Sequence, residues 1–171
     1  GTHTDITAQK TAEARIQRLS QLYATLSQCN QAIVRSSGEA DLFPQLCRDA
    51  VLYGDMKMAW IGMTDPATGR VTPVASYGDD LGYLDGIEIS VDGTSPFGTG
   101  PTGTAIRENR PVWFQDFLGD PRAAVWHERA VRAGWASSAS LPLRRDGAPV
   151  GAMTLYSGIP EFFEGEVQQL L

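Results

Sequence analysis

The sequence predicts an α+β fold, in which helices pack against one antiparallel β-sheet. Apolar residues recur every three or four positions near the start of the chain, which is typical of helices, and alternate with a period of two in later segments, which is typical of strands. The clearest strands come in pairs joined by short turns, and such hairpins are antiparallel. With 171 residues, 42% of them hydrophobic, the chain suits one domain with a substantial core.

The first segment, residues 11–36, is predicted to be a long helix without glycine or proline. Six residues follow one another at alternating steps of three and four: Ile16, Leu19, Tyr23, Leu26, Asn30 and Ile33. This spacing suits a two-stranded coiled coil, in which a buried Asn30 would fix the register. It suits equally an amphipathic helix that packs on its own domain, because Leu22 and Cys29 widen the apolar stripe. Both alternatives stay open.

The break at Ser36-Ser37-Gly38 precedes a second predicted helix over residues 39–53. Its buried face is expected to carry Leu42, Leu46, Ala50 and Tyr53. Beyond it the period changes, and residues 58–63 and 71–77 are predicted to form a hairpin around a turn at 65–69.

The segment 78–100 is rich in glycine and aspartate and is predicted to be mostly loop, with one short strand candidate at 86–91. The remaining elements are expected in this order: a short helix at 101–109 opened by Pro101, a strand at 111–114, a helix at 121–133, strands at 136–144 and 149–156 joined at Asp146-Gly147, and a final helix from about Phe162.

The charge balance disfavours two classes of partner. Fourteen Lys and Arg against twenty Asp and Glu give a net charge of −6, which repels nucleic-acid phosphates and acidic lipids. We therefore expect no nucleic acid and no direct membrane contact. No apolar run approaches the length of a membrane span, and the first thirty residues do not resemble a signal peptide, so a cytoplasmic location is expected.

The two cysteines, Cys29 and Cys47, both fall in predicted helices. Neither belongs to a C-x-x-C pair or to a His/Cys cluster with metal-ligand spacing, so we expect buried thiols and no metal site. His127 is the one histidine within the predicted fold and is expected at the surface, since no nucleophile with an orienting acid accompanies it. No catalytic residue is assigned.

Three stretches of the second half resemble a known family. They are Gly100-Pro101-Thr102-Gly103-Thr104-Ala105-Ile106-Arg107-Glu108, then Gln115-Asp116 with Asp120-Pro121-Arg122 and Trp126, then Ser138-Ala139-Ser140-Leu141-Pro142-Leu143 with 151–157. Taken in this order they resemble the GAF domains of bacterial signalling proteins, from about Leu19 to the end of the chain. Near the start, Asp5-Ile6-Thr7 followed by Lys10 resembles the closing strand of a PAS domain that runs into a signalling helix.

This resemblance implies a six-stranded antiparallel sheet with helices on both faces, a long N-terminal signalling helix, and a small-molecule pocket over one face. It also implies a parent of PAS, GAF and output order, the output being a diguanylate cyclase, a cyclic-di-GMP phosphodiesterase or a histidine kinase. Residues 1–12 would then end a preceding PAS-like domain or linker, and residues 13–171 would form the GAF domain. The position of the pocket carries over, but not its contents, so the cofactor stays unknown.

The candidate ligand-binding residues come from four places: the helix start with Gly100, Thr102, Gly103 and Thr104; the two indoles of Trp60 and Trp126; the loop residue Asp116; and the strand hydroxyls of Ser138 and Ser140. Amides at the helix start would point outward to an anionic or carbonyl group. The two indoles would sandwich a planar ligand. Alternation puts both serines on one face of their strand.

Each of these features also has a purely structural reading. The two glycines would permit a tight turn and close packing. Either tryptophan would fill an aromatic core, and the serines would bond to neighbouring loops. For Asp116 the structural reading is favoured, because a loop aspartate commonly accepts backbone N–H bonds.

Three well-defined classes of GAF domain depend on residues that this chain does not have. The methionine sulfoxide reductases of the family need cysteines in the pocket loops, the bilin-binding members need a Cys-His pair in a pocket helix, and the cyclic-nucleotide-binding members carry an Asn-Lys-Phe-Asp-Glu signature. The chain is therefore expected not to be an enzyme. We expect a sensor of an unidentified small molecule that forms a homodimer; the alternative is a spacer that dimerises without a ligand.

Overall fold

The computed structural model describes residues 39–54, 56–79 and 82–163, together with Glu13, Gln17 and Ser20. Its sheet has five strands: β1 (Met58–Thr64), β2 (Val71–Tyr77), β3 (Val112–Phe114), β4 (Ser137–Arg145) and β5 (Ala148–Ser157). They lie in the order β2-β1-β5-β4-β3, and every neighbouring pair is antiparallel. This confirms the predicted α+β class and its antiparallel sheet.

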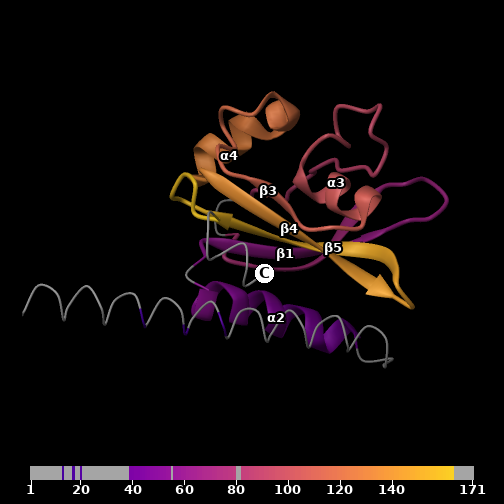
Figure 1. Ribbon diagram of the computed structural model, residues 1–171, viewed down its shortest axis with the longest axis horizontal. Coiled ribbons are helices and arrows are strands. Elements are labelled where there is room, and N and C mark those ends of the chain that lie inside the picture. The colour runs from indigo at the N-terminus through magenta and orange to yellow at the C-terminus, as the bar shows by residue number, and fades with distance from the viewer. Residues whose placement is uncertain are drawn as a thin grey trace, which may run out of the picture.

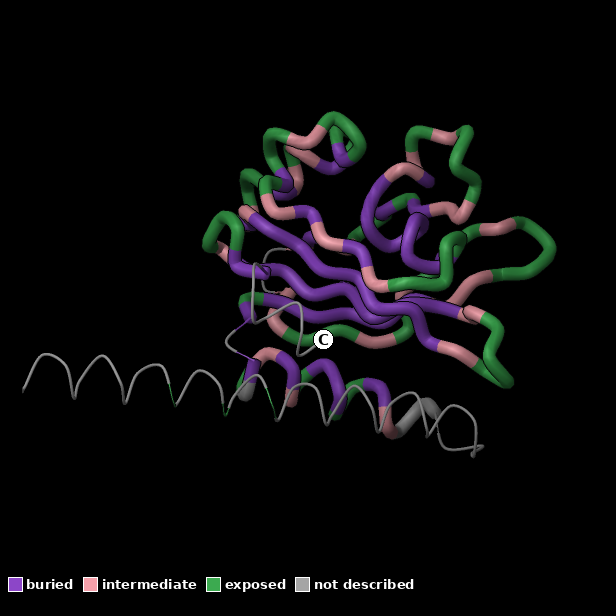
Figure 2. Tube along the Cα trace, viewed as in Figure 1, coloured by how far each residue is buried: buried purple, intermediate pink, exposed green. Residues whose placement is uncertain are grey.

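The helices lie in two layers on opposite faces of the sheet (Figure 1). α2 (Glu39–Gly54) covers one face and contacts β1 and β2. The other face is covered by α3 (Pro101–Glu108), by the 3-10 helix η1 (Pro121–Trp126) and by α4 (His127–Ala133). The sheet is therefore buried on both sides, as the central strands in Figure 2 show.

The two faces of the sheet build two separate cores. The core on the α2 side joins residues from the helix and from alternate strand positions: Phe43, Leu46, Cys47, Ala50, Ile61, Leu141, Met153, Leu155 and Phe163 among others. The core under α3 and α4 is aromatic, with Trp60, Phe114, Phe117, Trp126, Trp135, Tyr83 and Tyr156. Strand alternation explains the division, since Trp60 and Ile61 are neighbours in β1 and point to opposite faces.

The last hairpin follows its sequence signal closely. Asp146 and Gly147 have φ angles of 53° and 80°, and a two-residue turn of type I′ requires positive φ at both positions. The turn aligns β4 with β5 so that Ser138 lies opposite Tyr156 and Ser140 opposite Thr154. All four of these side chains therefore lie on the face covered by α3 and α4.

The segment 86–91 does not form the sixth strand that the family resemblance implied. It makes one isolated bridge, between Ser90 and Arg70, with Val91 N–H bonding to Gly69 O at 2.9 Å. The N–H of Ser90 itself bonds to Phe97 O at 2.9 Å, because the chain turns back on itself there. The sheet in the described residues therefore has five strands.

The single helix predicted at 121–133 is two helices. The carboxylate of Asp120 accepts the N–H of Arg122 at 3.0 Å and tightens the first turn. Ala123 leaves the helical region with φ −106° and ψ 15°, and α4 begins only at His127.

Several predictions lie outside the described residues. They include most of the helix at 11–36 with Asn30 and its coiled coil, Cys29, and the helix expected beyond Phe162, where only a turn up to Phe163 is described. Within the described ranges, no helix has the length and apolar character to cross a bilayer.

Candidate functional site

A small cavity lies between the sheet and its covering layer. We call it the aromatic cavity; its wall consists of Tyr83, Ile87, Ile89, Pro101, Thr102, Phe117, Trp126 and Tyr156. Its volume is about 10 Å³, which is room for about one water molecule. Aromatic side chains therefore fill most of the space over this face of the sheet.

Tyr156 of β5 is the centre of the aromatic cluster. Trp135 stacks on its ring with centroids 5.3 Å apart, and Tyr83 and Phe117 meet it edge-on at 5.2 and 6.1 Å. The indole Nε1 of Trp60 donates to its hydroxyl at 3.2 Å. Burial raises the pKa of Tyr156 to about 12 and, together with the neighbouring Tyr156, raises that of Tyr83. Both phenols are therefore neutral near pH 7.

The alkaline stability of the domain is expected to depend on Tyr156. Its pKa of about 12 in the folded state exceeds the value of about 10 in an unfolded chain. Because the folded state keeps its proton longer, the free energy of unfolding falls between about pH 10 and pH 12, by about 3 kcal/mol for this residue. Urea unfolding measured across that range should show a shallower decline for Tyr156→Phe than for the wild type; parallel curves would contradict the assignment.

Two buried donors beside Tyr156 have no hydrogen-bond partner among the described residues. They are the hydroxyl of Ser138, directly opposite Tyr156 in the sheet, and Nε1 of Trp135, which stacks on it. Buried polar groups in proteins are nearly always paired, and the exceptions often mark sites that water or a ligand completes. The aromatic cavity is thus flanked by two donors that have no partner among the described residues.

Ser140 differs from Ser138 in that its hydrogen bonds are made within the protein. Its hydroxyl lies 2.6 Å from that of Thr154, which lies 2.7 Å from the hydroxyl of Thr102 in α3. This buried cluster ties the start of α3 to the sheet. Of the predicted pair of serines, Ser138 is the one still able to serve a ligand.

The glycines at the start of α3 are packing residues in this structure. A Cβ at Gly100 would overlap the indole of Trp126, and one at Gly103 would overlap the backbone oxygen of Ser90. All side chains from Pro101 to Ile106 are buried, and Thr104 N–H already bonds to Gly100 O at 3.2 Å. The helix start is therefore closed over by the chain rather than open to solvent.

The two tryptophans take different places. Trp126 lines the cavity, and its Nε1 donates to Glu88 O at 3.2 Å. Trp60 is fully buried and does not line the cavity; its Nε1 donates to the hydroxyl of Tyr156, which does. The predicted sandwich of a ligand between the two indoles is thus not preformed.

Two polar residues near the cavity organise the loop between β3 and α4. Asp116 is exposed, and its carboxylate accepts the N–H of Gly119 at 3.1 Å. His127 is half-buried rather than exposed, since its Nε2 lies 2.9 Å from Asp120 O and its ring meets Phe117 edge-on.

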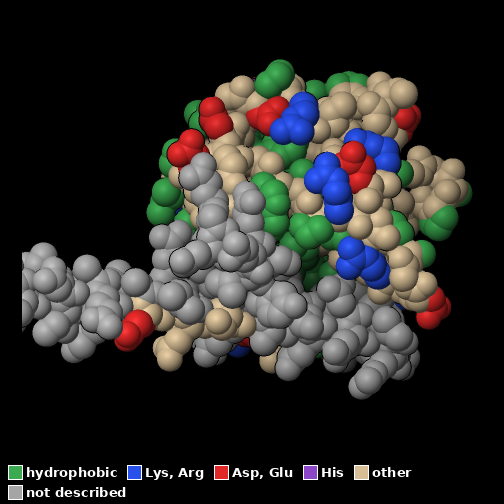
Figure 3. All heavy atoms as spheres, viewed as in Figure 1, with side chains coloured by type: hydrophobic (Ala, Val, Ile, Leu, Met, Phe, Trp, Pro, Cys, Tyr) green, Lys and Arg blue, Asp and Glu red, His purple; other side chains and the backbone are tan. Residues whose placement is uncertain are grey.

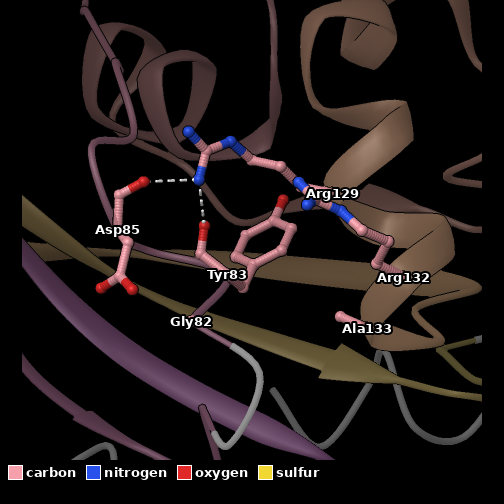
Figure 4. Close-up of a pocket in the computed structure, with 6 residues that line it drawn as sticks. All are labelled: Gly82, Tyr83, Asp85, Arg129, Arg132 and Ala133. Carbon is pink, nitrogen blue, oxygen red and sulfur yellow. Dashed lines mark hydrogen bonds between the residues drawn. The ribbon is translucent and has the colours of Figure 1, made fainter.

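A second, larger pocket opens beside the first and was not predicted. It has a volume of about 300 Å³ and is lined by Gly82, Tyr83, Asp85, Arg129, Arg132 and Ala133 (Figure 4). We call it the arginine pocket. The one local signal in the sequence was the pair of arginines three residues apart, which puts both on one face of α4.

A GAF-domain family model matches residues 36–171 of the chain. The protein belongs to the GAF domain family. This GAF domain is similar in fold to several solved structures, all at low sequence identity, and no curated protein matches it.

The free methionine-R-sulfoxide reductase of Neisseria meningitidis, solved with its substrate, has a TM-score of 0.63 at 16% identity, over 88% of this chain and 86% of that one. The nlh2 GAF domain of A. aeolicus in an inactive state has a TM-score of 0.61 at 12% identity, over 88% and 84%. A domain assigned to a two-component sensor histidine kinase of Sinorhizobium meliloti 1021 has a TM-score of 0.55 at 20% identity, over 79% and 83%.

The described part of this GAF domain contains no set of metal ligands. No group of three or more His, Cys, Asp or Glu side chains there is placed to hold an ion. Its described cysteine, Cys47, is buried in the α2-side core, across the sheet from the aromatic cavity.

Proposed function

We propose that this GAF domain is a non-catalytic sensory module of a signal-transduction protein, which binds a small molecule at the aromatic cavity. The pair of unsatisfied donors around Tyr156 carries this proposal. Ligand sites combine apolar aromatic walls with a few convergent polar groups, and the cavity has both. The ligand would be a planar molecule with an acceptor for Ser138 or Trp135.

Binding at this cavity would change the covering layer. A volume of about 10 Å³ holds no organic molecule, so a ligand must displace aromatic side chains such as Tyr83 or Trp126. The liganded and ligand-free states would then differ in the position of that layer, and the difference in affinity between them drives the switch.

The terminal helices would relay this change to an output domain. The parent would have PAS, GAF and output order, with the GAF domain from residue 13 and the output in cyclic-di-GMP or kinase signalling. The similarity in fold to a sensor histidine kinase domain supports a signalling parent. The helix predicted at 11–36 would make the homodimer.

A reductase function is disfavoured by the positions of the cysteines. The chain has two, Cys29 and Cys47, and none in the segments that line the aromatic cavity. Cys47 lies on the far side of the sheet. Methionine sulfoxide reductases that share this fold act through thiols, and the described residues place none at the cavity.

A second candidate is a structural spacer that dimerises without a ligand. The near-complete filling of the cavity favours it, because aromatic side chains already occupy the place where the ligand would lie.

Ligand binding is tested by native mass spectrometry of the purified chain and by thermal unfolding with L-amino acids, nucleoside monophosphates, benzoate and indole. A retained mass, or a rise in Tm with one of these compounds, supports the sensor, since binding to the folded state stabilises it. No retained mass and no rise in Tm would favour the spacer.

Two neighbouring serines give a matched pair of variants. Ser138→Ala removes a buried hydroxyl that has no partner among the described residues, so it should keep or raise the Tm without ligand while reducing the ligand-induced rise. Ser137→Ala should lower stability by about 1 kcal/mol and leave binding intact, because the Ser137 hydroxyl bonds to Ile159 O at 2.7 Å and points to the other face. Equal effects of the two variants on binding would place the ligand elsewhere.

A further inference from the structure

The arginine pocket lies on the outer side of Tyr83, between α4 and the loop at 82–85 (Figure 4). Its volume of about 300 Å³ is that of about ten water molecules in the liquid. This pocket admits a small organic molecule without any displacement of the aromatic core.

Two guanidinium groups provide unused donors in this pocket. Arg129 bonds to Tyr83 O at 2.9 Å and to Asp85 O at 2.6 Å, both through Nη1. Its Nη2 and Nε keep three N–H groups without a partner among the described residues. Arg132 makes no hydrogen bond or ion pair with any described residue, so all five N–H donors of its guanidinium are unused there.

The other arginines of this layer are engaged by the protein. Arg110 pairs with Glu108 and Arg122 with Asp120, while Arg107 bonds to the carbonyls of Val91 and Gly98. Basic and acidic side chains lie close together on the described part of the face in Figure 3. Arg129 and Arg132 share a pocket in which neither pairs with a carboxylate of the described residues.

The described acidic groups near the pocket do not pair with its guanidiniums. Asp85 turns its backbone oxygen toward Arg129 and its carboxylate to the opposite side (Figure 4). The carboxylate of Asp79 accepts the backbone N–H groups of Tyr83 and Leu84 at 2.6 and 3.0 Å. Among the described residues, no carboxylate bonds to either guanidinium, so their remaining N–H groups can serve an external acceptor.

The position of Arg132 in the last turn of α4 has a simpler partial explanation. A cation there is stabilised by the negative end of the helix dipole, by about 0.5 kcal/mol. This accounts for a basic residue at that position. It does not account for a second guanidinium with unused donors in the same pocket.

We propose that the arginine pocket binds a small oxyanion, the carboxylate or phosphate group of an organic molecule. The planar fork of a guanidinium matches the paired oxygens of both groups. Because the chain carries a net charge of −6, the long-range field does not attract anions, and the affinity must come from these local contacts. Binding at this site needs no opening of the aromatic cavity, so a failure of the proposed function would not refute it.

The test is isothermal titration calorimetry of the 171-residue chain with sodium benzoate, inorganic phosphate and the neutral benzamide. Benzoate or phosphate should bind and benzamide should not, and the affinity should fall as salt is added. Binding of benzoate alone identifies a carboxylate site and binding of phosphate alone a phosphate site. Equal binding of benzamide and benzoate, or binding of none of the three, would overturn the proposal.

The matched variants are Arg132→Gln and Arg48→Gln. Arg132→Gln should weaken anion binding at least about tenfold, since a charge-assisted hydrogen bond contributes about 1.5–3 kcal/mol. Its Tm should fall only slightly, because Arg132 makes no hydrogen bond or ion pair with a described residue and its interaction with the helix dipole contributes only about 0.5 kcal/mol. Arg48 is exposed on α2, across the sheet, so Arg48→Gln removes the same charge and should leave the affinity within about twofold of the wild type.

If the two variants bound the anion with equal affinity, any change from the wild type would come from the net charge alone, and the proposed site would be refuted. Ser138→Ala separates this proposal from the proposed function. It should leave anion binding at the arginine pocket unchanged even where it weakens a ligand at the aromatic cavity.

Discussion

A Trp60→Ala variant is expected to lose about 4 kcal/mol of its free energy of unfolding. Trp60 is fully buried, and its Nε1 donates to Tyr156 at 3.2 Å. Truncation removes the largest side chain on this face of β1 and leaves a void under the aromatic cluster. Urea unfolding of the variant and the wild type measures the difference.

Trp113→Ala is the matched control for this variant. Trp113 lies in the edge strand β3, is half-buried and contacts Phe163 with ring centroids 6.1 Å apart. We expect Trp113→Ala to lose about half as much free energy of unfolding as Trp60→Ala, because Trp113 buries less apolar surface on folding. Equal losses would show that Trp60 is not central to this core.

Indole added to Trp60→Ala gives a second reading of the same site. A dry apolar void of this kind binds aromatic molecules, as engineered cavities do. A rise in Tm with indole for the variant, absent in the wild type, would show that the space over the sheet accepts a planar ligand once one aromatic side chain is moved.

The strands were predictable because their signals are local. The predicted strands at 58–63 and 71–77 and the turn Asp146-Gly147 agree with the structure within a residue or two. Helix η1 was not separable from α4, because the division lies in backbone angles, with Ala123 outside the helical region, and apolar periodicity does not indicate such a change. The segment 86–91 failed as a strand because the chain reverses just after it and the N–H of Ser90 bonds to Phe97 O, a turn that the sequence pattern did not predict.

The candidate site was only partly predictable, because its residues come together from distant parts of the chain. Two of the candidate residues, Thr102 and Trp126, line the aromatic cavity, but its other aromatic walls, Tyr83, Phe117 and Tyr156, were not among the candidates. They come from two loops and a strand, and nothing in the sequence near any of them indicates the others. The arginine pocket likewise depends on a loop that approaches α4 from far away in the chain.

Gly103→Ala is expected to destabilise the domain by about 3 kcal/mol, although alanine in place of a helical glycine ordinarily stabilises by about 1 kcal/mol. The sign is reversed because a Cβ at this position would overlap the backbone oxygen of Ser90 and crowd that of Gly98. Backbone atoms cannot rotate away, so α3 or the loop at 90–98 must move. Thermal and urea unfolding of the variant measure the change.

Gly100→Ala is the comparison, because its Cβ would meet the indole of Trp126 instead of the backbone. A side chain can shift, so its loss should be smaller than that of Gly103→Ala. This order of losses follows only if the glycines serve close packing of α3 against the chain that covers it. If Gly103→Ala proved stabilising, the start of α3 would be open, and its amides would again be candidates for holding an anionic or carbonyl group.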